Sequence, residues 1–140
     1  MVRSAVVASG LMFASLSFAA QFAIDQLPVG SEVTLPATAK TTVPMGSRVK
    51  ITSTDTPQTL SILPVGNGST FAAPISLAIY DSHQERVKYV TVAPNAPFLY
   101  SFKGLSSISI QPTLPKDKAL LSAGGIRMQI ESDKPVTVAR

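Results

Sequence analysis

The strongest constraint in this sequence is an alternation of apolar and polar residues with a period of two, which recurs along most of the chain after residue 20. Ile75, Leu77 and Ile79 alternate with smaller or polar neighbours. Successive side chains of a strand point to opposite faces of a sheet, so such a run puts one apolar row inward. The same spacing occurs in eight further segments: Val33–Leu35, Val49–Ile51, Leu60–Ile62, Val87–Tyr89, Phe98–Phe102, Ile108–Ile110, Ile126–Ile130 and Val136–Val138. The pattern predicts an all-β fold, a single antiparallel β-sandwich of jelly-roll or immunoglobulin-like type with about eight or nine short strands.

Proline placement agrees with many short strands. Proline lacks the N–H that an interior strand needs, so we expect prolines such as Pro44, Pro64 and Pro112 between strands or at their first residue. One short helix is predicted over Pro115–Leu121, because proline in its first turn and the glycines after its end are typical helix boundaries.

The first twenty residues have the layout of a secretory signal peptide. Arg3 precedes an apolar run from Ala5 to Phe18, and small residues then offer a cleavage site near Ala19 or Ala20. The alternative is an uncleaved anchor, but a membrane span needs ~20 strongly apolar residues and this run is shorter. We therefore expect a signal peptide at 1–20 and one β-sandwich domain at 21–140, not membrane-spanning after processing.

Composition removes several classes of protein. The chain has no cysteine, which excludes disulfides, thiolate metal sites and thiol catalysis. It has one histidine, so few acid/base relays are available. We expect no cofactor and no metal, and a disulfide-free domain held by its core.

The only histidine lies in the segment Asp81–Glu85, between two predicted strands. In an extended chain, Asp81, His83 and Glu85 would share one face and could approach a metal ion, but nothing elsewhere supplies the remaining ligands. Polar residues are also the ordinary content of a hairpin loop. No Gly-x-Ser-x-Gly motif presents a nucleophile. We expect no enzyme and no catalytic residue; the alternative is a small secreted hydrolase centred on His83.

Basic residues give the most suggestive pattern. Arg48 and Lys50 lie two apart, as do Arg86 and Lys88, and on strands each pair projects from one face. On neighbouring strands these four residues would form a ligand-binding patch for a protein or an acidic envelope polymer. The alternative is that they solvate the surface and protect sheet edges. Nucleic acid is not expected, because the aromatic residues of Phe98–Phe102 have the spacing of a core row.

The chain ends suggest a second function. Gln21–Asp25 and Lys134–Arg140 are each able to pair within their own sheet or with a neighbour's edge, which would give a homo-oligomer or a self-assembling structural subunit of a surface appendage or matrix. The segment Ile130–Arg140 is similar in pattern to the final strands of exported envelope and adhesin-type sandwiches. The sequence favours a non-enzymatic binding or accessory module, exported to the periplasm or the extracellular space.

Overall fold

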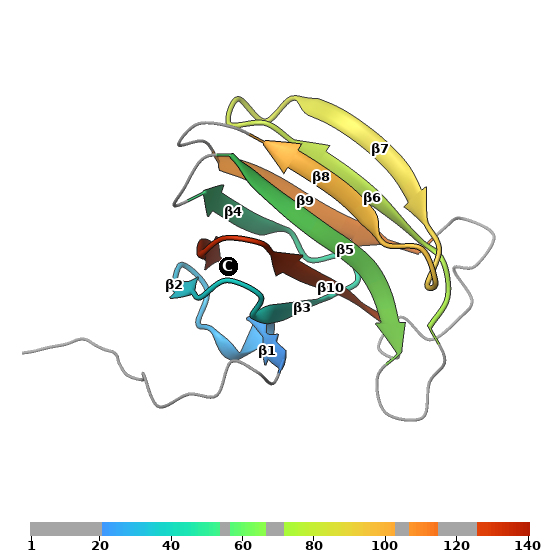
Figure 1. Ribbon diagram of the computed structural model, residues 1–140, viewed down its shortest axis with the longest axis horizontal. Coiled ribbons are helices and arrows are strands. Elements are labelled where there is room, and N and C mark those ends of the chain that lie inside the picture. Colours follow the sequence, from blue (N-terminus) through green and yellow to red (C-terminus); the bar gives the residue numbers. More distant parts are fainter. Residues whose placement is uncertain (1–20, 54–56, 67–71, 103–106, 115–125) are drawn as a thin grey trace, which may run out of the picture.

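The computed structural model describes residues 21–53, 57–66, 72–102, 107–114 and 126–140 (Figure 1). These residues form eleven β-strands and one 3-10 turn, η1 (Ile24–Gln26), without an α-helix. The strands are β1 (Gln21–Ala23), β2 (Glu32–Leu35), β3 (Lys40–Pro44), β4 (Val49–Ser53), β5 (Gln58–Gly66), β6 (Ile75–Tyr80), β7 (Arg86–Val92), β8 (Phe98–Phe102), β9 (Ser107–Thr113), β10 (Ile126–Ser132) and β11 (Val136–Ala139).

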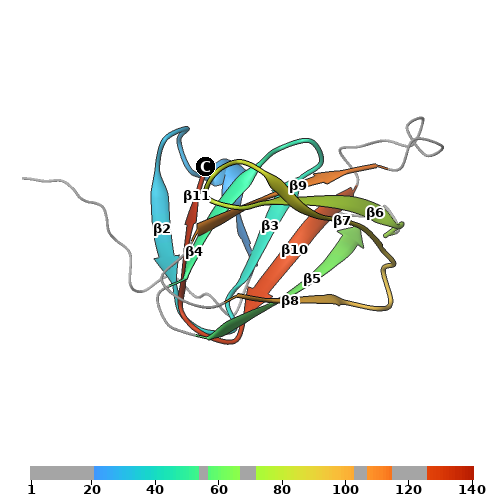
Figure 2. The same cartoon turned by 90° about the horizontal axis from the view of Figure 1, so that it is seen from above.

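The strands make two sheets that lie as two layers (Figure 2). Sheet A has the order β1-β3-β10-β5-β8, and sheet B has the order β2-β11-β4-β9-β6-β7. Every pairing is antiparallel except β1 with β3, which is parallel. The prediction of an all-β, antiparallel sandwich is confirmed at this level.

The predicted number of strands is wrong, because β3 was not foreseen and β1, although Gln21–Asp25 was expected to be able to pair, was not counted as a strand. In β3 the residues Thr41, Thr42 and Val43 are buried in succession, so the strand has no polar–apolar alternation. β1 has only three residues, too few to display a period. An alternating pattern identifies strands that have one buried and one solvent-exposed face, and neither β1 nor β3 shows this pattern.

The core lies between the two sheets. On the inner face of sheet A, the cross-strand row Thr41–Ile130–Ile62–Phe98 runs from β3 to β8. Sheet B contributes the matching rows of aliphatic side chains. Residues with no exposed surface in this core are Leu35, Val43, Val49, Ile51, Leu60, Ile62, Ile75, Leu77, Ile79, Ile110 and Met128. No disulfide reinforces the sandwich, so its stability rests on this burial.

β7 departs from the predicted pattern. The alternation placed Val87 and Tyr89 inward, but they are 49% and 58% exposed. The register shifts here: Lys88 pairs with Ile79 and Arg86 pairs with Tyr80, so Val87 is an extra, bulged residue. A bulge changes which face the following side chains occupy. Val90 and Val92 supply the inward row instead.

Three prolines belong to strands, contrary to the expectation that they would lie between strands or at their first residue. Pro44 is the last residue of β3, while Pro64 and Pro112 lie inside β5 and β9. At Pro64 and at Pro112 one neighbouring strand has already ended: β8 pairs only as far as Ile62, and β4 only as far as Ile110. A strand without a partner on one side tolerates a missing N–H.

The chain ends differ in their pairing. β1 is an edge strand of sheet A, whereas β11 lies between β2 and β4 and is hydrogen-bonded on both sides. The predicted signal peptide at 1–20 and the predicted helix over Pro115–Leu121 fall outside the described residues. Within the part of the chain that the structure describes, no helix has the length and apolar character needed to cross a membrane.

Candidate binding face on sheet B

A single cross-strand row brings distant basic residues together on the outer face of sheet B. The register aligns Ala139 with Lys50, Lys50 with Ser109, Ser109 with Tyr80, and Tyr80 with Arg86. Opposed residues lie about 5 Å apart and share a face. Lys50 in β4 and Arg86 in β7 therefore stand on the same surface, three strands apart. Sequence spacing alone could not show this, because it requires the sheet order.

Arg48 joins this face through Tyr80. Its guanidinium carbon lies 3.9 Å from the centre of the Tyr80 ring, a cation–π contact. Its Nη1 also donates a hydrogen bond of 2.9 Å to Oε1 of Gln84 in the β6–β7 loop. Arg86 makes a second cation–π contact, 5.0 Å from the centre of the Tyr89 ring. We call Arg48, Lys50 and Arg86, with Tyr80 and Tyr89, the basic face.

Lys88 does not belong to the basic face. It pairs with the buried Ile79, which places it on the inner side of β7. Its ammonium nitrogen lies 5.9 Å from the ring centre of Phe98, on the inner side of β8 in the opposite sheet. The bulge at Val87 separates Lys88 from Arg86, so the sequence-predicted patch is brought together at three of its four residues.

Carboxylates bound the basic face at both ends. Glu32, opposite Ala139, ends the row at the edge strand β2. Glu85 lies in the loop just before Arg86 and is exposed. Within the row, positive charge therefore runs from Lys50 in β4 to Arg86 on the edge strand β7, and this strip fits a narrow acidic ligand better than a broad acidic surface.

The β6–β7 loop is held by Asp81. Its Oδ1 accepts hydrogen bonds from the backbone N–H groups of His83 and Glu85, at 2.9 and 3.0 Å. Gln84 has a φ of 66°, a left-handed conformation, and its N–H donates to the Asp81 carbonyl. His83 is exposed, and the described residues contain no group of three His, Asp or Glu side chains placed to hold a metal ion. The Asp81 carboxylate thus has a structural task in shaping the loop.

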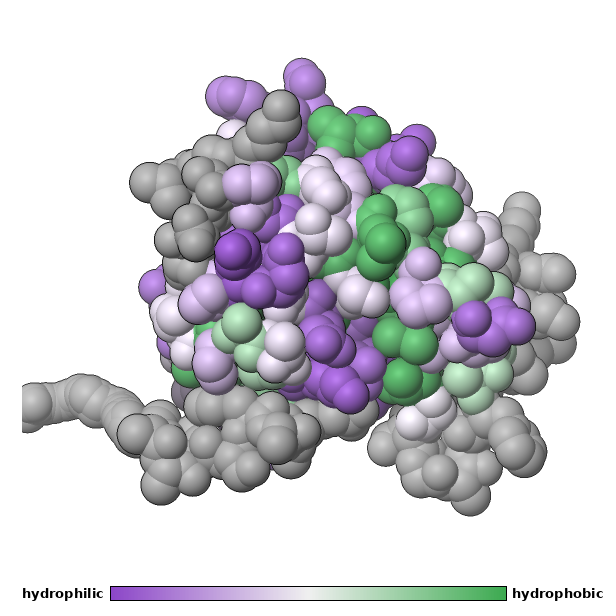
Figure 3. All heavy atoms as spheres, in the orientation of Figure 1, coloured by the Kyte–Doolittle hydropathy of each residue, from purple (hydrophilic) through white to green (hydrophobic). Residues whose placement is uncertain are grey.

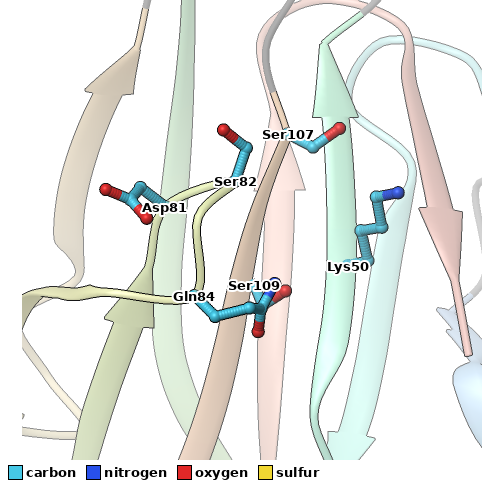
Figure 4. Close-up of a pocket in the computed structure, with 6 residues that line it drawn as sticks. All are labelled: Lys50, Asp81, Ser82, Gln84, Ser107 and Ser109. Carbon is cyan, nitrogen blue, oxygen red and sulfur yellow. The ribbon is translucent and has the colours of Figure 1, made fainter.

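Beside the basic face, the outer surface of sheet B is hollowed. A cavity of 180 Å³ lies between β4, β9 and the β6–β7 loop, as Figure 4 shows. Short serine side chains on β9, flanked by a lysine and by the loop, leave this space. The hollow is lined by Lys50, Asp81, Ser82, Gln84, Ser107 and Ser109.

Two lining groups have unused hydrogen-bonding capacity. Ser109 is only 7% exposed, and within the described residues its hydroxyl makes no hydrogen bond. Lys50 likewise has neither an ion pair nor a side-chain hydrogen bond to that part of the chain. By contrast, the Ser107 hydroxyl is hydrogen-bonded to that of Thr52 at 2.9 Å. The sequence analysis did not identify the serines or Gln84 as site residues. Serines are scattered along the chain, and without the strand register nothing shows which of them lie together.

A different surface lies on the outer face of sheet A. Figure 3 shows apolar atoms gathered over β5 and β8. Leu99 is 65% exposed, and the partly exposed Leu63 and Val65 lie on the neighbouring strand.

One ion pair joins the first and last parts of the domain. Asp25 Oδ1 lies 2.7 Å from Nη2 of Arg127, and this bond lowers the pKa of the Asp25 carboxyl below its ordinary value of 3.8. The guanidinium of Arg140 donates to the backbone oxygens of Asp25 and Leu27, at 3.2 and 2.6 Å. These contacts hold η1 against the C-terminal strand β11 and the residue that follows it.

Comparison with known proteins gives no further guide. No family model matches the chain, and neither a curated protein nor a solved structure matches it significantly.

Proposed function

We propose that this chain is an exported, non-enzymatic β-sandwich that binds an acidic partner through the basic face of sheet B. In this proposal residues 1–20 are a signal peptide cleaved near Ala19 or Ala20, and the domain acts in the periplasm or outside the cell. The partner is an acidic envelope polymer; an acidic protein is the alternative that the experiment below separates.

One observation carries the proposal: the register of sheet B places Lys50 and Arg86 in one row, and Arg48 stacks beside them. Three cations from two distant segments of the chain then share a face with two tyrosines. Grouped like charges are costly without a counter-charge, which favours a surface that meets an anionic partner. The tyrosines hold two guanidinium groups in place, so less side-chain entropy is lost on binding.

A catalytic role for His83 has less support. Asp81 Oδ1 is already hydrogen-bonded to two amides of its own loop, and His83 faces solvent. His83 has no base-orienting partner among the described residues.

The test measures retention on immobilised polygalacturonate, with immobilised polyglutamate as the peptide counterpart. The double variant Lys50→Gln/Arg86→Gln should elute from polygalacturonate at much lower salt than the wild type. The matched control Lys88→Gln/Lys134→Gln removes the same charge away from the basic face and should elute close to the wild type.

If both double variants lose retention equally, the protein is adsorbed through its net charge alone, and this result would overturn the proposal. Stronger retention on polyglutamate than on polygalacturonate, lost in the first variant alone, would make the partner an acidic protein.

Self-assembly through the chain ends is the second candidate. Only the N-terminal strand β1 is available for it without rearrangement, because β11 is paired on both sides. A concentration series in sedimentation velocity tests it, with a single monomeric species as the result that would exclude it.

A further inference from the structure

We infer that the hollow beside Lys50 is a subsite for one acidic sugar unit, a hydroxyl-rich ring carrying a carboxylate or a phosphate. The inference deepens the proposed function and rests on it: the polymer runs along the basic face, and one of its units enters the hollow.

The size of the hollow sets the size of the ligand. Pockets for whole small molecules enclose about 300–1,000 Å³. This hollow has a volume of 180 Å³, below that range. It therefore accepts one ring or one small group of a longer ligand, with the remainder of the ligand outside on the sheet.

The lining sets the chemistry. Lys50 supplies a positive charge and three donors, and the hydroxyls of Ser82 and Ser109 both donate and accept. The Gln84 amide nitrogen donates, while its oxygen is occupied by Arg48. Asp81 has one carboxylate oxygen, Oδ2, outside the hydrogen bonds of its loop. A bare anion could use only the hydrogen-bond donors of the hollow. A sugar ring with hydroxyls and one anionic group could use its acceptors as well.

The hydroxyl of Ser109 opens into the hollow without a hydrogen-bond partner from the described residues. Among those residues, the one fully buried side-chain polar atom that lacks a partner is Gln58 Oε1, so the Ser109 oxygen is reached by the solvent that fills the hollow. Ser109 lines the hollow at 7% exposure and has no partner in the described chain. A ligand hydroxyl that displaces water from the hollow would supply the hydrogen-bond partner that Ser109 lacks.

The walls of the hollow are already fixed. On the loop side, Asp81 holds the backbone and Arg48 holds Gln84. On the strand side, Thr52 holds the hydroxyl of Ser107. A preformed site loses little entropy when its ligand binds. Lys50 belongs both to the hollow and to the row that leads to Arg86, so a bound unit continues directly onto the basic face.

The first experiment is an amide NMR titration of the processed protein with glucuronate, glucose 6-phosphate, glucose and inorganic phosphate as separate probes. The acidic sugars should shift the amides of Lys50, Ser107 and Ser109 and bind about tenfold more tightly than glucose. The tighter of the two acidic sugars names the anionic group. Inorganic phosphate binding as tightly as both sugars would reduce the hollow to an anion site and overturn the inference, as would shifts confined to other strands.

The second experiment fills the hollow without changing charge. Ser109→Leu should weaken binding of the preferred acidic sugar about tenfold or more, because it removes a hydroxyl and occupies the space. Ser107→Leu is the second filling variant, and thermal unfolding of both shows whether the sandwich is intact. A folded filling variant that binds the acidic sugar like the wild type contradicts the inference.

The two proposals fail in different ways. If Lys50→Gln/Arg86→Gln loses retention on polygalacturonate while folded Ser109→Leu keeps it in full, the basic face stands and the sugar subsite is wrong. If neither variant changes retention, both are wrong.

Discussion

Asp25 joins the start of the domain to two strands near its end. Its carboxylate binds Arg127 in β10, and its backbone oxygen accepts a hydrogen bond from Arg140 after β11. The Asp25 side chain is 43% exposed, so water screens the pair. Such partly exposed ion pairs contribute about 0.2–1 kcal/mol.

Asp25→Asn should lower the free energy of unfolding by up to about 1 kcal/mol at neutral pH. The folded-state pKa of Asp25 lies below 3.8, so its contribution is present above 3.8 and is lost as the pH falls through the folded-state pKa. Urea unfolding of both proteins against pH should therefore show a difference that disappears in strongly acidic solution. A difference independent of pH would contradict the electrostatic origin.

Thr38 is a site of backbone strain. It has a φ of 67° in the turn from Pro36 to Ala39, and β-branched residues rarely adopt this left-handed conformation. Asparagine tolerates it better, so Thr38→Asn should raise the free energy of unfolding by about 0.5–1 kcal/mol. Thermal unfolding checks this, with Ala37→Asn as the neighbouring control that should give no gain. A lower melting temperature for Thr38→Asn would refute the account of strain.

Among the elements, β7 shows most clearly what the sequence can and cannot predict. The strand itself was predicted, but the residues that face the core were predicted incorrectly. No feature of the sequence Arg86–Val92 indicates that Val87 forms a bulge. The even spacing of Arg86 and Lys88 suggested one face, and the bulge put them on two. Strands such as β5 and β10, which keep their register, follow the predicted alternation.

Deletion of Val87 should leave the fold and the basic face in place but promote self-association. The deletion restores a regular ladder in which Arg86 still faces Tyr80, and it removes the irregularity that makes the β7 edge a poor template for another strand. Sedimentation velocity should show dimers or larger species at concentrations where the wild type is smaller. An unchanged distribution would show that the bulge does not protect this edge.

For the whole molecule, stability depends on the layer between the sheets. Ile62 has no exposed surface and lies between β10 and β8, so Ile62→Ala should cost about 2–5 kcal/mol in urea unfolding. Leu99→Ala, on the neighbouring strand but 65% exposed, should change stability by about 0.5 kcal/mol or less. Similar losses in the two variants would mean that the layers are not packed as described.

The order of strands is the property that the sequence could not supply. Nine of the eleven strands follow from local alternation, but the neighbours of β4 and β9 are set by long-range pairing. The candidate site depends on that pairing, since Lys50, Ser109 and Tyr80 are adjacent only through β4, β9 and β6. Basic residues could therefore be nominated from the sequence, whereas the hollow beside them could not.

Lysine footprinting tests the central claim most directly: the chain is acetylated at limiting reagent with and without polygalacturonate, and modification is read by mass spectrometry. Binding through the basic face predicts that Lys50 is protected while Lys88 and Lys134 react as before. Equal protection of all three lysines, or protection of Lys88 with Lys50 still reactive, would contradict the account.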